Sequence, residues 1–230
     1  MILILAAMPQ ELNAIKAYIK VDEELTVLDK TAYKGSLAGQ EVLLALTGIG
    51  KVSTAMTLTS ILSSTWVDAI LNLGSAGGLG SHQAIGDVVI AEKGSFHDRF
   101  FSDQPDLSSA NRFSCDTELI KRMDSVLNSV HINHHKGLMV SGDQFLTQLT
   151  PHYETLGTYF PDAISVDMES TTVMQVAQEF KVPCLVIRSL SDVPSASDHE
   201  GQFDHYLEFA AKQSALMCLE FMKSYQNETL

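Results

Sequence analysis

Short apolar runs alternate with helical patterns along most of the chain. Six runs are apolar at nearly every position, which is typical of strands buried on both faces of a sheet. They lie at residues 2–7, 42–46, 69–73, 88–91, 164–166 and 185–187. Five longer stretches repeat apolar residues at the spacing of an amphipathic helix. These stretches lie at residues 12–19, 52–62, 119–130, 169–180 and 203–221.

The alternation of strands and helices predicts an α/β fold, in which a mostly parallel central sheet is covered by helices on both faces. Residues 31–46 carry Gly35 and Gly39 as turn signals and favour an antiparallel excursion, so we expect a mixed sheet. No repeat, low-complexity tract or linker rich in Pro, Gly or Ser divides the sequence. We therefore expect a single domain over residues 1–230.

The composition excludes several classes of protein. Acidic residues outnumber basic ones 28 to 15, for a net charge of −13, and no Lys/Arg cluster is dense enough to bind nucleic acid or an anionic membrane. The three cysteines are odd in number and form no Cys-x-x-Cys pair, so we expect a reducing compartment and a cytoplasmic location. Residues 1–8 are apolar but lack a basic leader, which indicates a first strand and not a targeting signal.

Polar and charged residues follow the predicted strands at the edge where an open α/β sheet binds ligands. Reading along the chain, these are Met8 and Glu11, the turn 47–50, the glycine-rich segment 74–78, Asp167-Met168-Glu169, and Arg188 with Ser191 and Asp192. The three carboxylates of Glu11, Glu169 and Asp192 and the arginine Arg188 are thus expected at one edge. Two glycine-rich turns would allow the backbone to approach a flat or hydroxylated ligand closely.

Several common catalytic motifs are excluded. A P-loop ending at Gly50-Lys51 would need Gly at position 45 and Ser or Thr at 52, where Ala45 and Val52 stand. The segment 74–78 does not match Gly-x-Gly-x-x-Gly, and Ser75 lacks the preceding glycine of a nucleophile elbow. Neither nucleotide hydrolysis, dinucleotide binding nor serine esterase chemistry is indicated.

Each candidate residue also has a purely structural interpretation. Glu11 lies in the first turn of a helix, where an acid meets the helix macrodipole favourably, and Asp167 is a candidate N-cap for the helix that Glu169 opens. Asp192 lies in a turn-like Ser-Asp-Val-Pro sequence. Arg188 ends a buried run, and since buried charges are paired, we expect it to contact one of the three carboxylates.

Other candidates point away from metal or cofactor chemistry. His131, His134 and His135 are the only histidine cluster, and a surface turn explains them better than a ligand set, so no metal and no cofactor are expected. Met8 and Phe145 could each belong to the core. Residues 94–113 are polar, dotted with aromatics and poorly periodic, which favours a mobile loop over a site.

Seven short motifs follow one another along nearly the whole chain. They are Ala7-Met8 with Glu11, Thr47-Gly48-Ile49-Gly50-Lys51-Val52, Asn72-Leu73-Gly74-Ser75-Ala76-Gly77-Gly78, Gly86-Asp87-Val88-Val89, Val140-Ser141-Gly142-Asp143-Gln144-Phe145, Val166-Asp167-Met168-Glu169 and Arg188-Ser189-Leu190-Ser191-Asp192. In this order they resemble the nucleoside phosphorylase/hydrolase superfamily, and within it the 5′-methylthioadenosine/S-adenosylhomocysteine nucleosidases. The resemblance implies cleavage of an adenine nucleoside at its N-glycosidic bond.

The resemblance also implies a role for each charged candidate. Asp192 would protonate adenine N7 as the general acid, and its pKa would have to be raised by desolvation. Glu11 would position and deprotonate the attacking water, with Arg188 orienting both, and Glu169 would hold the ribose hydroxyls. The remaining implied contacts are Met168 under the ribose, Phe145 on the base, the backbone of Phe145 or Leu146 at the adenine edge, Ser75 and Ser191 as supporting hydrogen-bonders, and Met8, Ile49 and Phe203 as apolar lining. Members of the family are homodimers, so a second subunit would complete the 5′-thioether pocket.

Three alternatives stay open. A phosphorolytic purine nucleoside phosphorylase would need arginines to bind phosphate, and Arg99 is the arginine that leaves this alternative open. The loop after Asp98 departs from the family pattern, so another adenine nucleoside such as 6-amino-6-deoxyfutalosine is an alternative substrate. The pathway that the enzyme serves stays open among methionine salvage, the activated methyl cycle and menaquinone synthesis. A binding module without turnover is the third alternative, but it would have no need of three carboxylates.

Residues 194–202 are a candidate lid over the site.

Overall fold

The computed structural model describes residues 1–146, 150, 153–192 and 199–225, with the side chains of 154 and 199–205 excepted. Its strands are β1 (Ile2–Ala6), β2 (Lys20–Val27), β3 (Lys30–Leu37), β4 (Gln40–Leu46), β5 (Ala69–Gly78), β6 (Val88–Phe96), β7 (Phe113–Ser114), β8 (His134–Ser141), β9 (Ala163–Asp167) and β10 (Cys184–Asp192). Its helices are α1 (Pro9–Lys16), α2 (Lys51–Ser64), α3 (Thr117–Ser129), α4 (Tyr153–Tyr159), α5 (Ser170–Phe180) and α6 (His199–Ser224), with a 3₁₀ turn at Ser109–Asn111.

The ten strands belong to one sheet with two distinct parts. On one side β1, β4, β3 and β2 extend outward from β5, and β2–β3–β4 form the predicted antiparallel excursion. On the other side β5, β10, β6, β8 and β9 form a closed ring, because β5 is hydrogen-bonded to both β10 and β9. Among the described strands, five pairings are parallel and five antiparallel, so the sheet is mixed as predicted but no more than half parallel.

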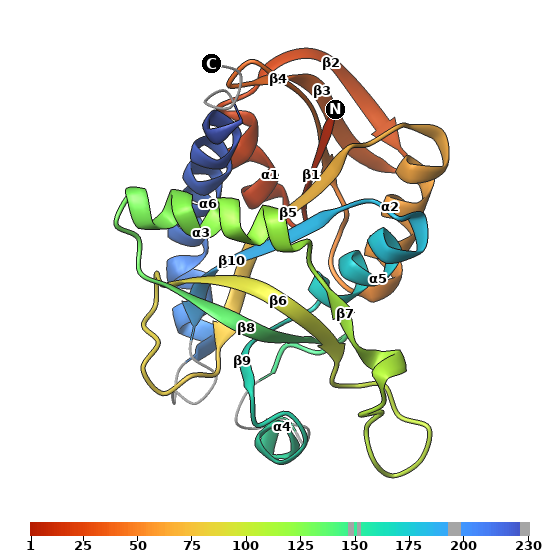
Figure 1. Cartoon of the computed structure of the whole chain (residues 1–230), viewed down its shortest axis with the longest axis vertical. Coiled ribbons are helices and arrows are strands. Elements are labelled where there is room, and N and C mark those ends of the chain that lie inside the picture. The colour runs from red at the N-terminus through yellow and green to blue at the C-terminus, as the bar shows by residue number, and fades with distance from the viewer. Residues whose placement is uncertain (147–149, 151–152, 193–198, 226–230) are drawn as a thin grey trace.

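Helices cover both faces of this sheet, as predicted (Figure 1). Along β1, Ile2 and Ile4 pack into one core with residues of α1, α3 and α6, whereas Leu3 and Leu5 pack into a second core with residues of α2 and α5. A strand whose side chains alternate between two apolar layers must be apolar at every position. This double burial is the reason that the strands read as continuous apolar runs in the sequence.

All six predicted strands and all five predicted helices are present, with ends that differ by a few residues. The segment 94–113 was expected to be a loop, but its first residues extend β6 to Phe96 and Phe113 begins β7. Strand β8 was missed because its first half is polar, and β2 was missed because most of it is exposed and charged. Most of the proposed lid 194–202 lies outside the described residues. No helix in the described part of the chain is long and apolar enough to span a membrane.

The glycine-rich segment 74–78, expected to be a turn, continues β5 as far as Gly78. Its neighbour β10 runs on to Asp192, where Asp192 is paired with Gly77, so the predicted turn at Ser191 and Asp192 is also strand. The other predicted turn is present, since Gly48 and Gly50 both have positive φ angles. The three cysteines are free and buried.

Candidate active site

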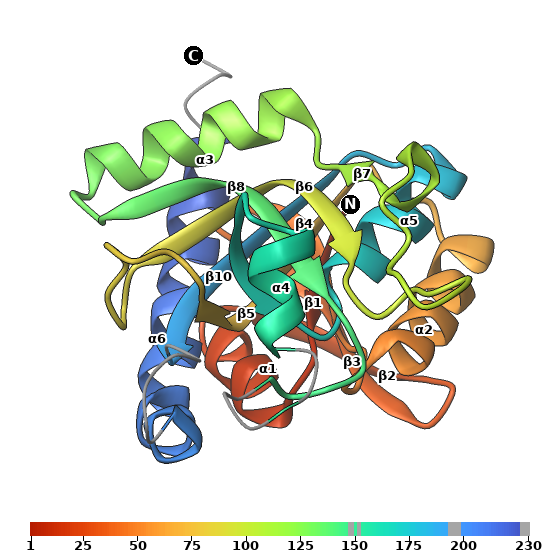
Figure 2. The ribbon, with the colours of Figure 1, turned by 90° about the horizontal axis from the view of Figure 1, so that it is seen from below.

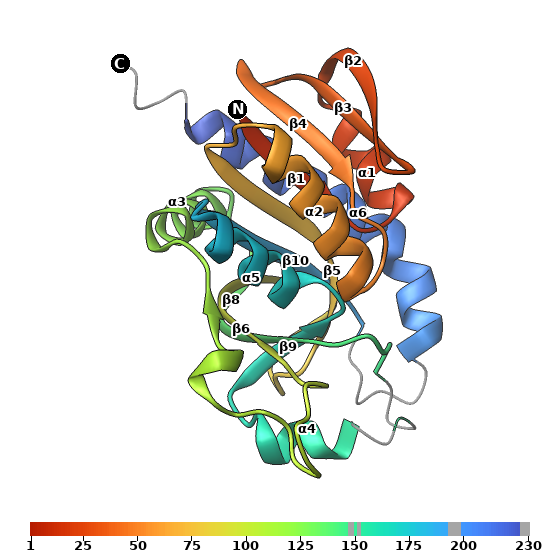
Figure 3. The ribbon, with the colours of Figure 1, turned by 90° about the vertical axis from the view of Figure 1, so that its right-hand side faces the viewer.

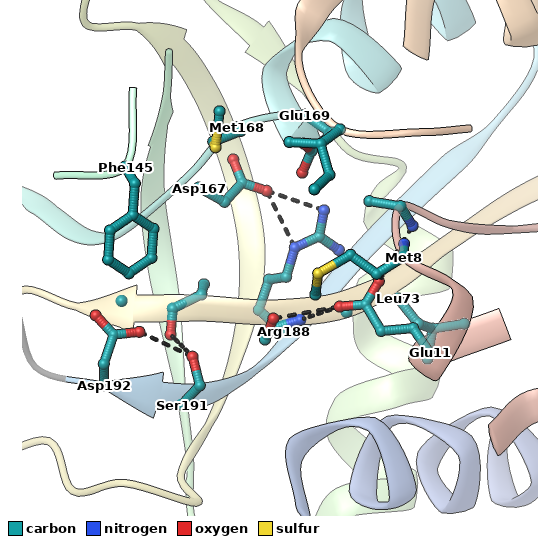
Figure 4. A pocket seen from close by; sticks show the side chains of 16 residues that line it. Met8, Glu11, Leu73, Phe145, Asp167, Met168, Glu169, Arg188, Ser191 and Asp192 are labelled. Carbon is teal, nitrogen blue, oxygen red and sulfur yellow. Dashed lines mark hydrogen bonds and ion pairs between the residues drawn. The ribbon is translucent and has the colours of Figure 1, made fainter. Parts of the chain in front are cut away.

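A pocket with a volume of about 270 Å³ lies where β1, β5, β9 and β10 bring their carboxyl-terminal residues together (Figure 4). Figure 2 views the molecule from the end at which α4 lies. The pocket is lined by Ala7, Met8, Glu11, Ile49, Leu73, Gly74, Ser75, Ala76, Gly77, Phe145, Asp167, Met168, Glu169, Arg188, Ser191 and Asp192. The structure thus brings ten of the twelve predicted site residues to one cavity, at the edge that the strand order predicted.

Arg188 forms the floor of the pocket together with Asp167 and Asn72. Its Nε and Nη2 lie 3.0 and 2.9 Å from Asp167 Oδ2, and Nη2 donates to Asn72 Oδ1 at 2.6 Å. Nη1 donates to the carbonyl oxygens of Asn72 and Ile187. Four of these contacts are hydrogen bonds and the contact from Nη2 to Asp167 is an ion pair, so the guanidinium is directed at the floor and makes no hydrogen bond to Glu11.

The expected partner of Arg188 was therefore wrong: it is Asp167, and not Glu11, Glu169 or Asp192. Asp167 also accepts hydrogen bonds from Ser141 Oγ at 2.6 Å and from the backbone N–H of Ser170 at 3.1 Å. The latter contact satisfies the first free N–H of α5, but the N-cap position is Glu169, so the interpretation of Asp167 as the N-cap was wrong. One buried carboxylate thus joins β8, the start of α5 and the arginine of β10, and we call Arg188, Asp167, Asn72 and Ser141 the pocket floor.

Glu11 is held by four hydrogen bonds from two elements. Its Oε2 accepts from the backbone N–H groups of Ala7 and Met8 at 3.1 and 3.2 Å, and its Oε1 accepts from the N–H and hydroxyl of Ser75 at 3.0 and 3.2 Å. A Cβ atom at Gly74 would lie 2.9 Å from Oε1, so only glycine allows this approach. Glu11 therefore stabilises the start of α1 and also lines the pocket.

Glu169 stands on the opposite wall of the pocket at the start of α5. Its Oε1 accepts the backbone N–H of Gly50 at 2.7 Å, which ties the 47–50 turn to this wall. Burial, followed by the negative charge of Asp167, raises the pKa of Glu169 from 4.5 to about 8, against the opposing effects of the Gly50 N–H and Arg188.

Burial also raises the pKa of Glu11, and the charge of Arg188 and the N–H groups around the carboxylate offset only part of that rise. Four buried carboxyl groups share this cavity with a single guanidinium: Glu11, Asp167, Glu169 and Asp192. The desolvated, acid-rich cavity thus favours the protonated forms of Glu11 and Glu169, the two groups whose pKa values are raised.

Asp192 is buried at the end of β10, and the hydroxyl of Ser191 lies 2.8 Å from its Oδ1. Figure 4 shows Asp192 and Phe145 at one end of the pocket, while Glu11 and Met8 are at the other. The two carboxyl groups therefore face different ends of a bound molecule.

The apolar candidates divide into three groups. Met8 and Met168 line the interior, while Ile49 and Phe145 are 57% and 37% exposed and form what we call the pocket mouth. Leu146 does not line the cavity, because its side chain packs into a small core with Val140, Leu156, Phe160 and Val166. The side chain of Phe203 lies outside the described residues.

The chain is similar to known proteins over nearly its whole length. The family model of the phosphorylase superfamily matches residues 1–221. The chain belongs to the phosphorylase superfamily. A 5′-methylthioadenosine/S-adenosylhomocysteine nucleosidase of Staphylococcus carnosus is 36% identical over 231 residues, which cover 97% of this chain and 100% of that protein.

Solved structures of two similar proteins have the same fold. The 5′-methylthioadenosine/S-adenosylhomocysteine nucleosidase of Neisseria meningitidis, in complex with methylthio-immucillin-A, has a TM-score of 0.90 at 31% identity. The match covers 97% of this chain and 98% of that one. The futalosine hydrolase of Helicobacter pylori has a TM-score of 0.87 at 34% identity, over 99% and 97% of the two chains. The resemblance identified from the seven motifs is confirmed.

Two residues of the pocket floor were not predicted to belong to the site. Asn72 was counted only within a motif, and Asp167 was named at a strand end and as a helix cap without a role at the site, yet both bind Arg188. The available signal was a polar residue inside the apolar run of β5, because a buried amide in a strand interior needs a specific partner.

The remaining histidine and arginine candidates lie away from the pocket. His134 and His135 begin β8 and pair singly with Asp124 and Asp87, at 3.0 and 2.8 Å, so the predicted surface turn holds only for His131. Arg99 pairs with Asp106 at 3.2 Å and donates to the carbonyl of Ala110. Among the described residues that line the pocket, Arg188 is the one arginine.

Proposed function

We propose that this chain hydrolyses the N-glycosidic bond of 5′-methylthioadenosine and S-adenosylhomocysteine, releasing adenine and a 5-thioribose. The observation that carries the proposal is the convergence of Glu11, Glu169 and Asp192 on one pocket. Cleavage of this bond requires a proton on the leaving purine, stabilisation of an oxocarbenium-like sugar and an activated water. The similarity to the S. carnosus nucleosidase supports the substrate class.

Asp192 acts as the general acid in this proposal. It donates a proton to adenine N7 while the bond between C1′ and N9 breaks, so that the bonding electrons leave with the neutral base. Its burial is the physical basis for expecting a carboxyl group that keeps its proton near neutral pH. The Ser191 hydroxyl, 2.8 Å from Oδ1, orients the carboxyl group.

Glu11 positions and deprotonates the water that attacks C1′. Four hydrogen bonds hold both of its oxygens, so the carboxylate presents its free lone pairs in a defined direction without reorganisation. A pKa raised by burial suits a general base that works near neutral pH. Arg188 influences Glu11 through its positive charge, since its hydrogen bonds go to other residues.

Glu169 accepts hydrogen bonds from the ribose hydroxyls, and Met168 lies under the sugar. The adenine lies at the end of the pocket where Phe145 stacks on the base and Asp192 reaches N7, and the backbone of Phe145 or Leu146 reads the adenine edge. Met8 and Ile49 supply apolar surface around the sugar and the 5′ substituent.

Water is favoured over phosphate as the nucleophile. A phosphate clamp needs arginine donors near the sugar. Arg188 has its donors committed to the floor, and Arg99 is paired with Asp106.

The reaction is tested by adenine release in phosphate-free buffer, with 5′-methylthioadenosine, S-adenosylhomocysteine and 6-amino-6-deoxyfutalosine as separate substrates. Hydrolysis predicts turnover of the first two without phosphate. Turnover only after phosphate is added would show a phosphorylase instead, and turnover of the third substrate alone would move the function to a futalosine-type nucleosidase.

The exposed apolar surface at the start of α2 supports a homodimer. Val52 and Met56 are 69% and 56% exposed and lie one helical turn apart on α2, which begins two residues after the exposed Ile49 of the pocket mouth. Helix α2 faces the viewer in Figure 3. A second subunit packed against this surface would cover the mouth and supply part of the 5′-thioether pocket.

Light scattering of Val52→Asp tests the dimer. We expect a dimeric wild type and a variant with half that mass and a raised KM, because a buried unpaired charge disrupts an interface. Leu216→Asp, at an exposed position on α6, is the control and should leave the mass unchanged. A fully active monomeric wild type would contradict the proposal.

A further inference from the structure

Three charged residues from separate segments meet just outside the pocket. Lys51 begins α2, Asp98 follows β6, and Asp143 follows β8. Lys51 Nζ lies 2.6 Å from Asp98 Oδ2 and 3.6 Å from Asp143 Oδ2. Asp98 Oδ2 also accepts the backbone N–H of Asp143 at 2.8 Å. The three residues therefore form one connected network, which we call the clamp.

Asp143 caps α2 from another part of the chain. Helix α2 begins after Gly50, which has no side chain to accept a hydrogen bond, and Asp143 Oδ1 accepts the N–H of Lys51 at 2.7 Å instead. An anionic oxygen at this position satisfies a free N–H and interacts favourably with the helix macrodipole. Gly50 has φ +90°, and a Cβ there would lie 2.9 Å from Asp143 Oδ1, so glycine is needed for the contact.

The clamp holds two segments that contribute to the pocket. Gly50, whose N–H binds Glu169, immediately precedes Lys51, and Ile49 at the mouth precedes Gly50. Phe145 at the mouth lies two residues after Asp143. Fixing Lys51 against Asp143 thus sets the distance between the 47–50 turn and the loop that carries Phe145.

The charges of the clamp favour its formation near neutral pH. Burial acts to raise the pKa of Asp98, but the hydrogen bonds from Lys51 and the Asp143 N–H outweigh it and lower the pKa below its usual range. The side chains of Lys51 and Asp98 are 27% and 20% exposed, so solvent screens their attraction only partly.

We propose that Lys51, Asp98 and Asp143 are positioning residues for the proposed nucleosidase site, which hold Gly50 against Glu169 and Phe145 over the base. The inference rests on the proposed function, and none of the three side chains lines the pocket. Because Asp192 and Glu11 are held by other elements, the clamp affects binding of the ribose and the base more than the chemical step.

The test compares Lys51→Met and Asp143→Asn with the control Lys34→Met, which removes an exposed pair with Glu41 on β3 and β4. For the clamp variants we expect KM to rise about tenfold while kcat changes by less than about threefold, the pattern of lost binding common to ground and transition states. Lys51→Arg should recover most of the loss. The double variant Lys51→Met/Asp98→Asn should raise KM no more than the more impaired of its two single variants does, because both substitutions break the same network.

Amide hydrogen exchange at Lys51 reports on the clamp without any substrate. It should be faster in Asp143→Asn, because an uncharged amide oxygen accepts this N–H more weakly than a carboxylate does, and unchanged in Lys34→Met. Unchanged exchange and KM in both clamp variants would overturn the inference, as would a lower melting temperature with unchanged KM. A wild type that releases no adenine would refute the proposed function, and the exchange measurement would still decide whether the clamp exists.

Discussion

Arg188 at the pocket floor is 2% exposed and donates four hydrogen bonds, whereas Phe145 and Ile49 at the mouth are 37% and 57% exposed. The floor consists of strand residues joined by short buried hydrogen bonds. The mouth consists of loop residues held by a partly exposed clamp. A buried charge network tolerates little change, while a mouth held by solvent-screened pairs can adapt to different 5′ substituents. The floor should therefore govern chemistry and stability, and the mouth affinity and specificity.

The largest effect is expected for Asp192→Asn, at the buried end of β10. The amide has the shape of the acid but cannot donate its proton to N7, so kcat should fall about 10²- to 10⁴-fold. Adenine release under saturating substrate measures this loss, and circular dichroism checks that the fold is intact. Unchanged turnover would remove Asp192 as the general acid.

Arg188→Met tests the floor as a source of stability. Removing the guanidinium leaves Asp167 buried without its counter-charge, and the free energy of unfolding should fall by about 3–5 kcal/mol. Urea denaturation measures the change. Adding Asp167→Asn to the same chain should restore part of the loss because the buried charge is gone, whereas further destabilisation would mean that the ion pair is not the cause.

Phe145→Ala tests the mouth. Stacking of a base on an aromatic ring contributes about 1–3 kcal/mol, so adenine should bind roughly 5- to 150-fold more weakly by calorimetry. The melting temperature should change no more than for Phe180→Ala, a similarly exposed phenylalanine on α5. Equal losses of affinity in the two variants would show that Phe145 does not contact the base.

The smallest effect is the change in stability over a single pH unit. The pKa of Glu169 is raised in the folded state, so between about pH 4.5 and 8 the folded chain binds more protons at this site than the unfolded chain does. Stability from this group is therefore present at low pH and is lost as pH rises, by at most about 1.4 kcal/mol per pH unit. Glu169→Gln should lose this dependence. Identical pH profiles of urea denaturation for both proteins would contradict the raised pKa.

Much of the fold followed from local patterns. The runs of β1, β5 and β10 are apolar throughout because their side chains enter two cores, and this pattern is legible in a single sequence. Strand β2 could not be predicted in the same way, because it lies at the edge of the sheet with mostly exposed side chains. Its pairing with β3 depends on backbone hydrogen bonds, which leave little trace in composition.

The sequence predicted which residues line the candidate site, but it did not predict which of their side chains bind one another. Glu11, Glu169 and Asp192 follow strands that end at one edge, so their convergence follows from parallel pairing. The partner of Arg188 did not follow, since several carboxylates lie close in sequence to strand ends and only side-chain direction separates them. The same holds for the clamp, whose residues lie far apart along the chain.

The sequence by itself determined the α/β class, the helices and central strands, the motif order and the residues that reach the pocket, because these depend on periodicity and on strand direction. The tertiary structure alone decided that β5 closes a ring through β10, β6, β8 and β9, and that Asp167 is the partner of Arg188. These features depend on three-dimensional distances and on the competition of several carboxyl groups for one buried positive charge. Local pattern carries no information about the outcome of that competition.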